Sequence, residues 1–159
     1  MGIYVKTSSG AECLHPSFNL VKTAMYNNSG DYNFKTITTN GTAWDNAVWD
    51  DIGLTYVVDT SHSRNYFIVP SSGIVIIQCS IAISSASPSS LIKVGANLHK
   101  NDILQYSIKS RIAQDFYANF TWFQKVNKGD KLAITFIHLY ENPIVCLGKS
   151  SRLNFVLVF

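Results

Sequence analysis

Hydrophobic and polar residues alternate along most of this chain with a period of two. The clearest case is residues 74–83, where positions 75, 77, 79, 81 and 83 are Val, Ile, Cys, Ile and Ile. No window of a dozen residues carries apolar side chains at the three-to-four spacing of a helix. Groups of Gly, Pro, Asn, Asp and Ser separate the alternating runs, as turns do between strands. The pattern therefore predicts an all-β chain.

About ten short strands account for the alternating runs, and their regular spacing is typical of a β-sandwich or barrel. We expect them at residues 18–26, 32–38, 54–58, 66–69, 74–83, 91–99, 103–112, 117–126, 132–140 and 152–159. The residues before the first strand look like a loose lead-in. We therefore expect an N-terminal lead-in at residues 1–16 and one domain at residues 17–159.

The expected strand at residues 74–83 is apolar on both faces over its first half. Ile74 and Ile76 lie opposite Val75 and Ile77, and their face turns small or polar from Gln78 onward. A strand that is apolar on both faces must be covered on both. In a small sandwich the second cover is often another subunit, so this strand indicates self-association.

The composition predicts a surface with few charges. Hydrophobic residues make up 47% of the 159 residues and aromatic residues 13%, enough to fill a sizeable core. Charged residues are only 14%, well under the usual quarter, and Ser, Thr and Asn make up the difference. Such a chain has a neutral polar surface or hides apolar surface in an oligomer. Both are typical of extracellular and virion proteins.

Charge and hydropathy exclude two classes of partner. The net charge is +3 and the basic residues are dispersed, so we expect no nucleic-acid partner. The longest apolar stretches are only as long as strands, which predicts no membrane insertion. The N-terminus lacks the apolar run of a signal peptide. A place on the virion or extracellular surface would then require another route, such as release of assembled virions.

The sequence carries no sign of catalysis. It has no nucleophile elbow, no His-Glu-x-x-His motif and no phosphate-binding loop. The four histidines are scattered, and His138 alternates with apolar residues as a core or interface residue does. Cys13, Cys79 and Cys146 lack metal-ligand or redox spacing, and Cys79 is expected in the core. We therefore expect no enzyme, no catalytic residue and no cofactor.

One short segment is a candidate ligand site on a loop. Its members are Trp44, Asp45, Trp49, Asp50 and Asp51. Carboxylates gathered on a loop could hold Ca²⁺, and the tryptophans could stack on sugar rings. The alternative is that the tryptophans pack over the end of the sandwich while the carboxylates are solvated.

Four segments resemble the globular head of complement C1q and its tumour necrosis factor (TNF) relatives. Residues 65–73 (NYFIVPSSG) look like the family's aromatic-x-Val-Pro-x-x-Gly entry to its central strand. Residues 98–101 (LHKN) are similar to its Leu-x-Lys-Asn hairpin, and residues 123–132 (FQKVNKGDKL) to its strand–Gly-Asp–strand turn. The fourth is the terminal strand. No collagen-like stalk precedes the domain, and stalkless versions of the fold look like knobs or caps of phage and other viral fibres.

The resemblance implies a ten-stranded jelly-roll β-sandwich that forms a tight homotrimer. Its contact sheet would carry the first, central, long and last strands. Carried over by position, the interface residues would be Ile74, Ile76, Gln78, Asn119, Thr121, Phe123, Phe155 and Leu157. The alternative is that these side chains fill the core of a monomer.

The resemblance implies two functions, and the tryptophans leave a third open. The first is a non-catalytic homotrimeric knob or cap of a viral fibre, with another virion or fibre protein as partner and loops for a receptor or glycan. The second is a secreted receptor ligand of the C1q/TNF type. The third is a monomeric carbohydrate-binding module. A jelly roll hosts many unrelated functions, so the step from fold to role is analogy.

Overall fold

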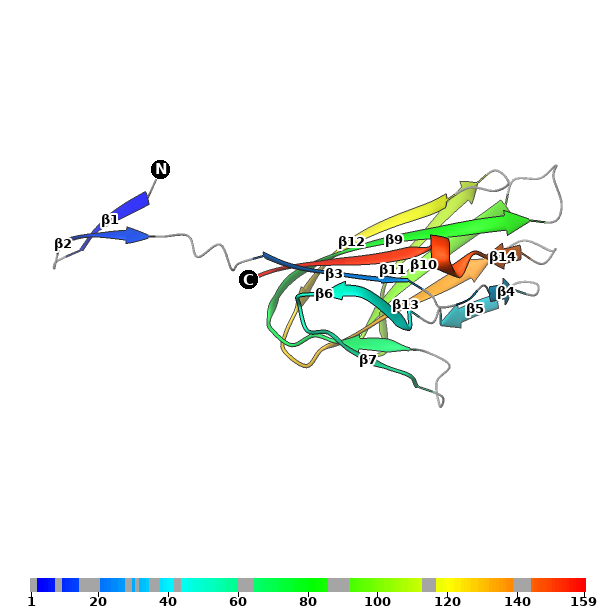
Figure 1. Ribbon diagram of the computed structural model, residues 1–159, viewed down its shortest axis with the longest axis horizontal. Helices are drawn as coiled ribbons and strands as arrows, with labels where there is room; N and C mark the ends of the chain where they lie inside the picture. The colour runs from blue at the N-terminus through cyan, green and yellow to red at the C-terminus, as the bar shows by residue number, and fades with distance from the viewer. Residues whose placement is uncertain are drawn as a thin grey trace.

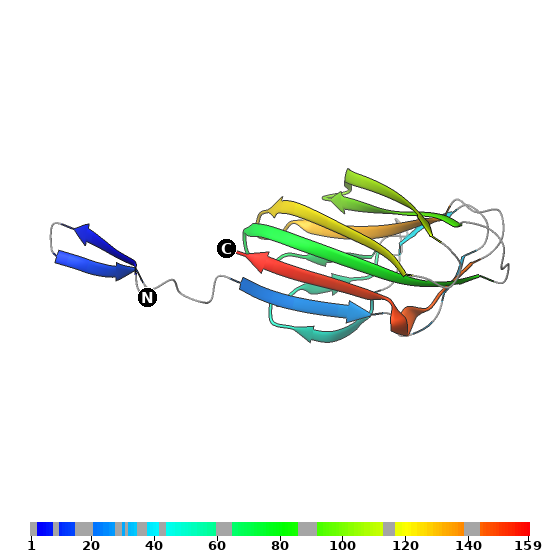
Figure 2. The same ribbon diagram turned by 90° about the horizontal axis from the view of Figure 1, so that it is seen from above.

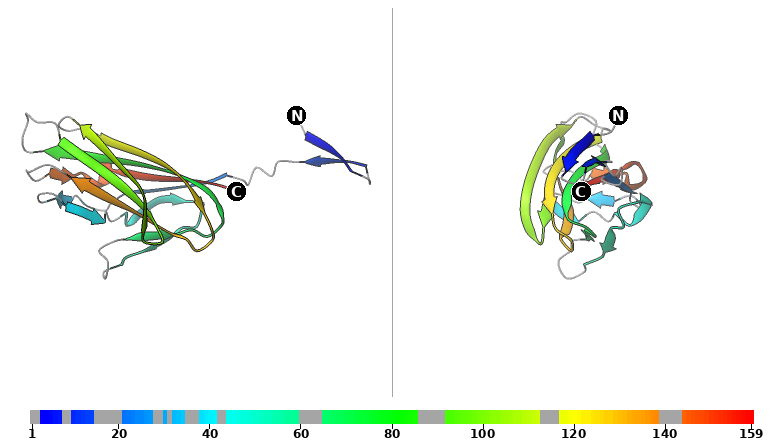
Figure 3. Two further views of the ribbon diagram at one scale, coloured as in Figure 1. Left: turned by 180° about the vertical axis from the view of Figure 1, so that it is seen from behind. Right: turned by 90° about the vertical axis from the view of Figure 1, so that its left-hand side faces the viewer.

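The computed structural model is a sandwich of two antiparallel β-sheets (Figure 1; Figure 3, right). It describes residues 3–7, 10–14, 21–27, 30, 32–34, 38–41, 44–59, 65–85, 92–112, 117–138 and 144–159. In those residues no helix is long and apolar enough to cross a membrane. Fifteen strands, β1 to β15, are present in the described residues, with one 3-10 turn, η2 (Gly148–Ser150).

We name the two layers after their central strands. The β9 sheet contains β4 (Tyr32–Phe34), β14 (Ile144–Cys146), β9 (Gly73–Ser85), β15 (Arg152–Val158), β3 (Val21–Asn27) and β6 (Asn46–Asp50) in spatial order, with β12 (Tyr117–Val126) also paired to β9. The β13 sheet contains β11 (Ile103–Ile112), β10 (Ile92–Lys100), β13 (Lys131–His138), β8 (Tyr66–Ile68) and β7 (Thr55–Val57), with β5 (Thr38–Gly41) also paired to β13.

The sandwich confirms the predicted all-β class, and the long alternating strands lie where they were expected. The strands predicted at 103–112 and 117–126 are β11 and β12, with the same bounds. The strand expected at 32–38 is two strands, β4 and β5, with residues 35–37 outside the described part. Residues 18–20 of the first predicted strand also lie outside it. β6 and β14 were not predicted.

The lead-in contains regular structure that the sequence did not suggest. β1 (Ile3–Thr7) and β2 (Gly10–Leu14) pair antiparallel, from Ile3 with Leu14 to Thr7 with Gly10, and form a separate two-stranded sheet (Figure 1). The expectation of a loose segment was therefore wrong for these residues. A hairpin of this kind is defined by main-chain hydrogen bonds between neighbouring strands, which leave little trace in the hydrophobic pattern.

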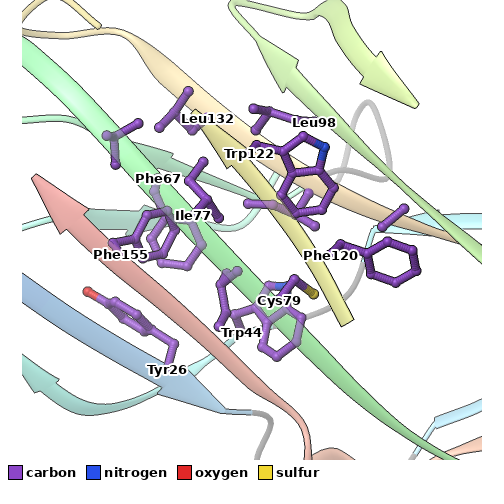
Figure 4. Close-up of a cluster of buried hydrophobic side chains, with 14 of the residues drawn as sticks. Tyr26, Trp44, Phe67, Ile77, Cys79, Leu98, Phe120, Trp122, Leu132 and Phe155 are labelled. Carbon is purple, nitrogen blue, oxygen red and sulfur yellow. The ribbon is translucent and has the colours of Figure 1, made fainter. Parts of the chain in front are cut away.

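The core between the sheets is organised around three aromatic rings (Figure 4). Phe67 of β8 packs against Tyr26 of β3 with ring centroids 4.7 Å apart, and against Phe155 of β15 at 4.9 Å. Both pairs have the edge-to-face geometry that aromatic rings prefer. Since Phe67 belongs to the β13 sheet and its two partners to the β9 sheet, these contacts join the two layers.

Gly73 explains part of the motif at residues 65–73. A Cβ atom placed on Gly73 would collide with the main-chain carbonyl oxygen of Val158, and backbone cannot move aside as a flexible side chain can. β9 begins at this glycine and runs directly beside β15. A residue without a side chain is therefore needed for the two strands to pair closely at this end.

Asp130 ties three turns together at the same end of the sandwich. Its carboxylate accepts hydrogen bonds from the Asn101 side-chain amide (2.8 Å) and the Asn127 main-chain N–H (2.8 Å), and it lies 3.5 Å from Lys100 Nζ. Its main-chain carbonyl accepts a bond from the Val69 N–H at 2.9 Å. Partial desolvation raises the pKa of Asp130, but the bonds from Asn127, Asn101 and Lys100 outweigh it and hold the pKa below its usual value.

Replacing Asp130 with Asn is expected to lower the free energy of unfolding by about 2 kcal/mol at neutral pH, the usual range for charge-assisted bonds. Because the folded-state pKa is lowered, this contribution is complete above the ordinary aspartate pKa of about 4 and disappears as the pH falls below it. Urea unfolding of wild type and variant between neutral and acidic pH measures the difference. Asp102→Asn is the control, since Asp102 is exposed in the neighbouring turn and its left-handed backbone suits Asn. Equal losses in both variants would contradict the assignment.

Candidate interaction surface

Four neighbouring strands of the β9 sheet, β3, β15, β9 and β12, turn one side away from the core (Figure 2). We call this side the outer face. Burial along β12 alternates strictly, so every second side chain belongs to it. The outer face consists of Val21, Thr23, Met25, Ile74, Ile76, Gln78, Ser80, Tyr117, Asn119, Thr121, Phe123, Lys125, Arg152, Asn154, Val156 and Val158.

One half of the outer face is apolar. Phe123 pairs with Ile76, which pairs in turn with Val156, so three apolar side chains form a row across three strands. In the next row Ile74 pairs with Val158 on one side and with Lys125 on the other, so one charged residue borders this half. Phe123 is 63% exposed and Ile74 50% exposed, although both are large hydrophobic residues. A shallow groove of about 550 Å³ lies in this half, lined in part by Ile74, Phe123 and Val158.

The other half of the outer face is polar. Its two rows run across β15, β9 and β12. They are Asn154–Gln78–Thr121 and Arg152–Ser80–Asn119. The change from apolar to polar therefore occurs at Gln78 on the central strand, and the same outer face offers two chemically different surfaces.

A second apolar surface lies at the edge where β11 and β12 end the two sheets. Within the described residues β11 pairs only with β10, and β12 only with β9. Ile103 is 66% exposed and Tyr106 48% exposed on β11. A small groove of about 220 Å³ separates the two strands, with Tyr106 and Ile108 on one side and Phe123 on the other. We call this surface the β11–β12 edge.

Six of the eight predicted interface residues lie together on the outer face. They are Ile74, Ile76, Gln78, Asn119, Thr121 and Phe123. Phe155 and Leu157 do not, because their side chains are fully buried between the sheets. The pairing of Phe155 with Ile77, a core residue, sets the phase of β15 and turns Asn154, Val156 and Val158 outward instead.

Sequence reasoning missed the outward valines of β15 and the aromatic β11–β12 edge. The alternation of Leu153, Phe155 and Leu157 was visible, and the larger side chains of an alternating strand usually face the core. That signal could have corrected the phase. Tyr106 offered no comparable signal, because its neighbours on the edge come from β12, which is distant in sequence.

The candidate loop site does not assemble. Trp44 is only 1% exposed and belongs to the core (Figure 4). The Asp50 carboxylate has a structural role. It accepts hydrogen bonds from the Tyr26 hydroxyl (2.6 Å) and from the N–H groups of Gly53 and Leu54 (2.8 Å each). The pKa of Tyr26 is raised far above its usual value. Burial is the main cause, and the hydrogen bond from the Tyr26 hydroxyl to Asp50 is the second. The interpretation of these residues as one site for Ca²⁺ or a sugar is therefore wrong.

The remaining members of that segment are exposed but separate. Asp45 and Asp51 are exposed, and among the described residues no three His, Cys, Asp or Glu side chains gather as metal ligands would. Trp49 is 45% exposed, and its indole N–H donates to the hydroxyl of Thr23, an outer-face residue, at 3.3 Å. Trp49 thus extends the outer face at its β3 side.

Two further predictions from the sequence are confirmed. Cys79 is buried in the core. Burial is the main cause that raises the pKa of its thiol, and electrostatic repulsion from Cys146 is the second. A thiol held protonated in this way is a poor nucleophile. His138 is also fully buried, as its alternation with apolar residues indicated.

Comparison with known proteins identifies the fold. No protein-family model matches the sequence, and no curated protein matches it. Among solved structures, Eiger TNF from S. frugiperda is similar with a TM-score of 0.55 and 14% identity, over 88% of this chain and 92% of its own. Murine APRIL gives a TM-score of 0.54 and 9% identity, over 87% of this chain and 99% of its own. The predicted C1q/TNF-like jelly roll is thereby confirmed as the fold.

The exposure of the three tryptophans gives a simple test of these placements. Trp44 and Trp122 are buried, and Trp49 is half exposed. Trp49→Phe is therefore expected to remove most of the acrylamide-quenchable tryptophan fluorescence of the native protein, whereas Trp44→Phe should leave that fraction intact. If Trp44→Phe removed the quenchable fraction, the core position of Trp44 would be contradicted.

Proposed function

We propose that this chain is a non-catalytic binding module that works as a homotrimer on the extracellular side, as a receptor ligand of the C1q/TNF type. The observation that carries the proposal is the exposed apolar half of the outer face. Soluble monomers rarely leave such a continuous apolar patch in water. The TNF-like jelly roll supports this reading over a viral fibre knob, because the similar solved structures are TNF-like proteins.

The contact we propose joins the apolar half of the outer face of one subunit to the β11–β12 edge of the next. Ile74, Ile76 and Val156 would receive Tyr106 and Ile103 from the neighbour. The two surfaces are different patches of one chain, so the contact is heterologous, and such contacts close into a ring when the rotation allows. The resemblance to C1q and TNF heads supports a ring of three. Phe123 belongs to both patches and would lie where the subunits meet.

This contact would also cover two sheet edges that are otherwise open to pairing with other chains. In the part of the chain that the structure describes, β11 and β12 each pair with one strand only, and an apolar edge of this kind is prone to uncontrolled pairing. Covering that edge inside a closed ring supports a defined assembly instead of open-ended association. The loops and hairpins outside the ring would remain for a receptor.

A fibre knob or cap of a virion is the second candidate. The observation that favours it is the separate β1–β2 sheet, which precedes the sandwich in the chain (Figure 1). A small independent element could attach the sandwich to another fibre protein. In this reading the trimer is the same, but β1–β2 carries the partner contact.

The first measurement is the mass of the wild-type chain in solution by multi-angle light scattering. We expect three times the 17.7 kDa of one chain, with no fall in mass on dilution into the low micromolar range. A monomer at all concentrations would overturn the trimer and remove the argument for both candidates.

Replacing Ile76 with Asp is expected to dissociate the trimer, because it would bury an unpaired charge at the contact at a cost of several kcal/mol per subunit. The monomer should stay folded, since Ile76 is only partly buried in one chain. Light scattering together with far-UV circular dichroism separates dissociation from unfolding. Val58→Asp is the matched control, because Val58 is 62% exposed and lies outside both proposed patches. An Ile76→Asp variant with unchanged mass would refute the contact.

A further inference from the structure

We propose that the polar half of the outer face holds a binding pocket for a carboxylated sugar. A cavity of about 480 Å³ opens there, lined by Ser80, Tyr117, Asn119, Lys149, Ser150 and Arg152. The six residues come from β9, β12, β15 and the turn η2. All of them belong to one chain, so the pocket does not depend on the proposed trimer.

The floor of the pocket is a row of side chains across three paired strands. Ser80 pairs with Asn119 on one side and with Arg152 on the other. Directly opposite residues of antiparallel strands hold their Cβ atoms about 4.5–5.5 Å apart. A hydroxyl, an amide and a guanidinium therefore lie side by side, at a spacing that one small molecule can bridge.

The wall of the pocket is fixed by a buried serine. Ser151 is fully buried, accepts a hydrogen bond from the Ala82 N–H at 3.0 Å and donates one to the Leu147 carbonyl at 2.9 Å. The Leu147 N–H also donates to the Ala82 carbonyl at 2.9 Å. These bonds hold η2 against β9, so that Lys149 and Ser150 are positioned beside Arg152 before any ligand arrives. A site held in this way loses little entropy on binding.

The charge of the pocket is positive. Lys149 and Arg152 supply two cations, and none of the six lining residues is acidic. Within the described part of the chain neither cation forms an ion pair. Arginine binds a planar carboxylate through two parallel bonds, and Lys149 adds a second cation to the lining of the same pocket.

The remaining lining residues favour a sugar over a bare anion. Ser80, Ser150 and Asn119 can donate to and accept from ring hydroxyls. Tyr117 is 53% exposed and offers an aromatic face with a polar hydroxyl, which suits the apolar face of a sugar ring. A hexuronic acid carries the carboxylate and the hydroxyls on one ring of suitable size.

Saturation-transfer NMR on the full chain tests this with two sugars that differ only at one carbon. D-glucuronate is expected to bind and D-glucose is not, and added salt should weaken the binding because the contact is ionic. Arg152→Gln and Lys149→Gln should each reduce the affinity for glucuronate about tenfold, the effect of losing one charge-assisted bond. Lys128→Gln is the matched control, because Lys128 is an exposed lysine just beyond the far end of β12.

Three results would overturn the proposal. Equal binding of glucose and glucuronate would remove the role of the carboxylate. Unchanged affinity in both Arg152→Gln and Lys149→Gln, with the fold intact by circular dichroism, would place the binding elsewhere. Displacement of glucuronate by an equal concentration of inorganic sulfate would show a general anion site, without recognition of a sugar. Light scattering on the same samples keeps this test apart from that of the trimer, since a monomer can bind glucuronate and a trimer can form without it.

Discussion

The architecture depends on the fact that β9 is apolar on both faces over its first half. Val75 and Ile77 point into the sandwich and are buried in the hydrophobic core. Ile74 and Ile76 point the other way, where the described residues form no second layer. Because successive side chains of a strand alternate between faces, one core cannot bury both sets. The outer face, with its need for a cover, is a direct consequence.

Each end of the outer face is held by one buried polar side chain. Asp130 fixes the turns beside the apolar half through Asn101 and Asn127. Ser151 fixes η2 beside the polar half through the main chain of β9 and Leu147. Asp130 accepts from the Asn127 N–H in a turn, and Ser151 accepts from the Ala82 N–H of β9, so each short side chain provides a partner for a main-chain group. These bonds hold the turns in place beside the outer face, which suits both assembly and ligand binding since little has to be ordered on contact.

The two proposals divide this surface by its chemistry. The apolar rows around Ile76 and Phe123 suit contact with another protein, because their exposure in water is unfavourable. The polar row of Arg152, Ser80 and Asn119 is stable in water and suits a small polar ligand instead. Asn119 is the one pocket residue that was also predicted at the interface, and it lies on the polar side of the boundary at Gln78.

The sequence alone determined the all-β class, the long strands and the two-faced character of residues 74–83, because a period of two over ten residues is a local property. It could not determine the existence of β14 or which strands lie beside β15, since both depend on pairing between distant segments. The phase of β15 was visible in its alternation, although the predicted interface placed Phe155 and Leu157 on the wrong face. Nor could it show that Trp44 is buried and Trp49 exposed. The two are five residues apart with similar neighbours, yet one is in the core and the other on the surface. Asp50 was expected at a ligand site and Ser151 carried no signal in the sequence, and only tertiary structure brought them to the main-chain groups that they satisfy. Periodicity records which side of its own strand a residue occupies, whereas packing between distant strands decides what lies on that side.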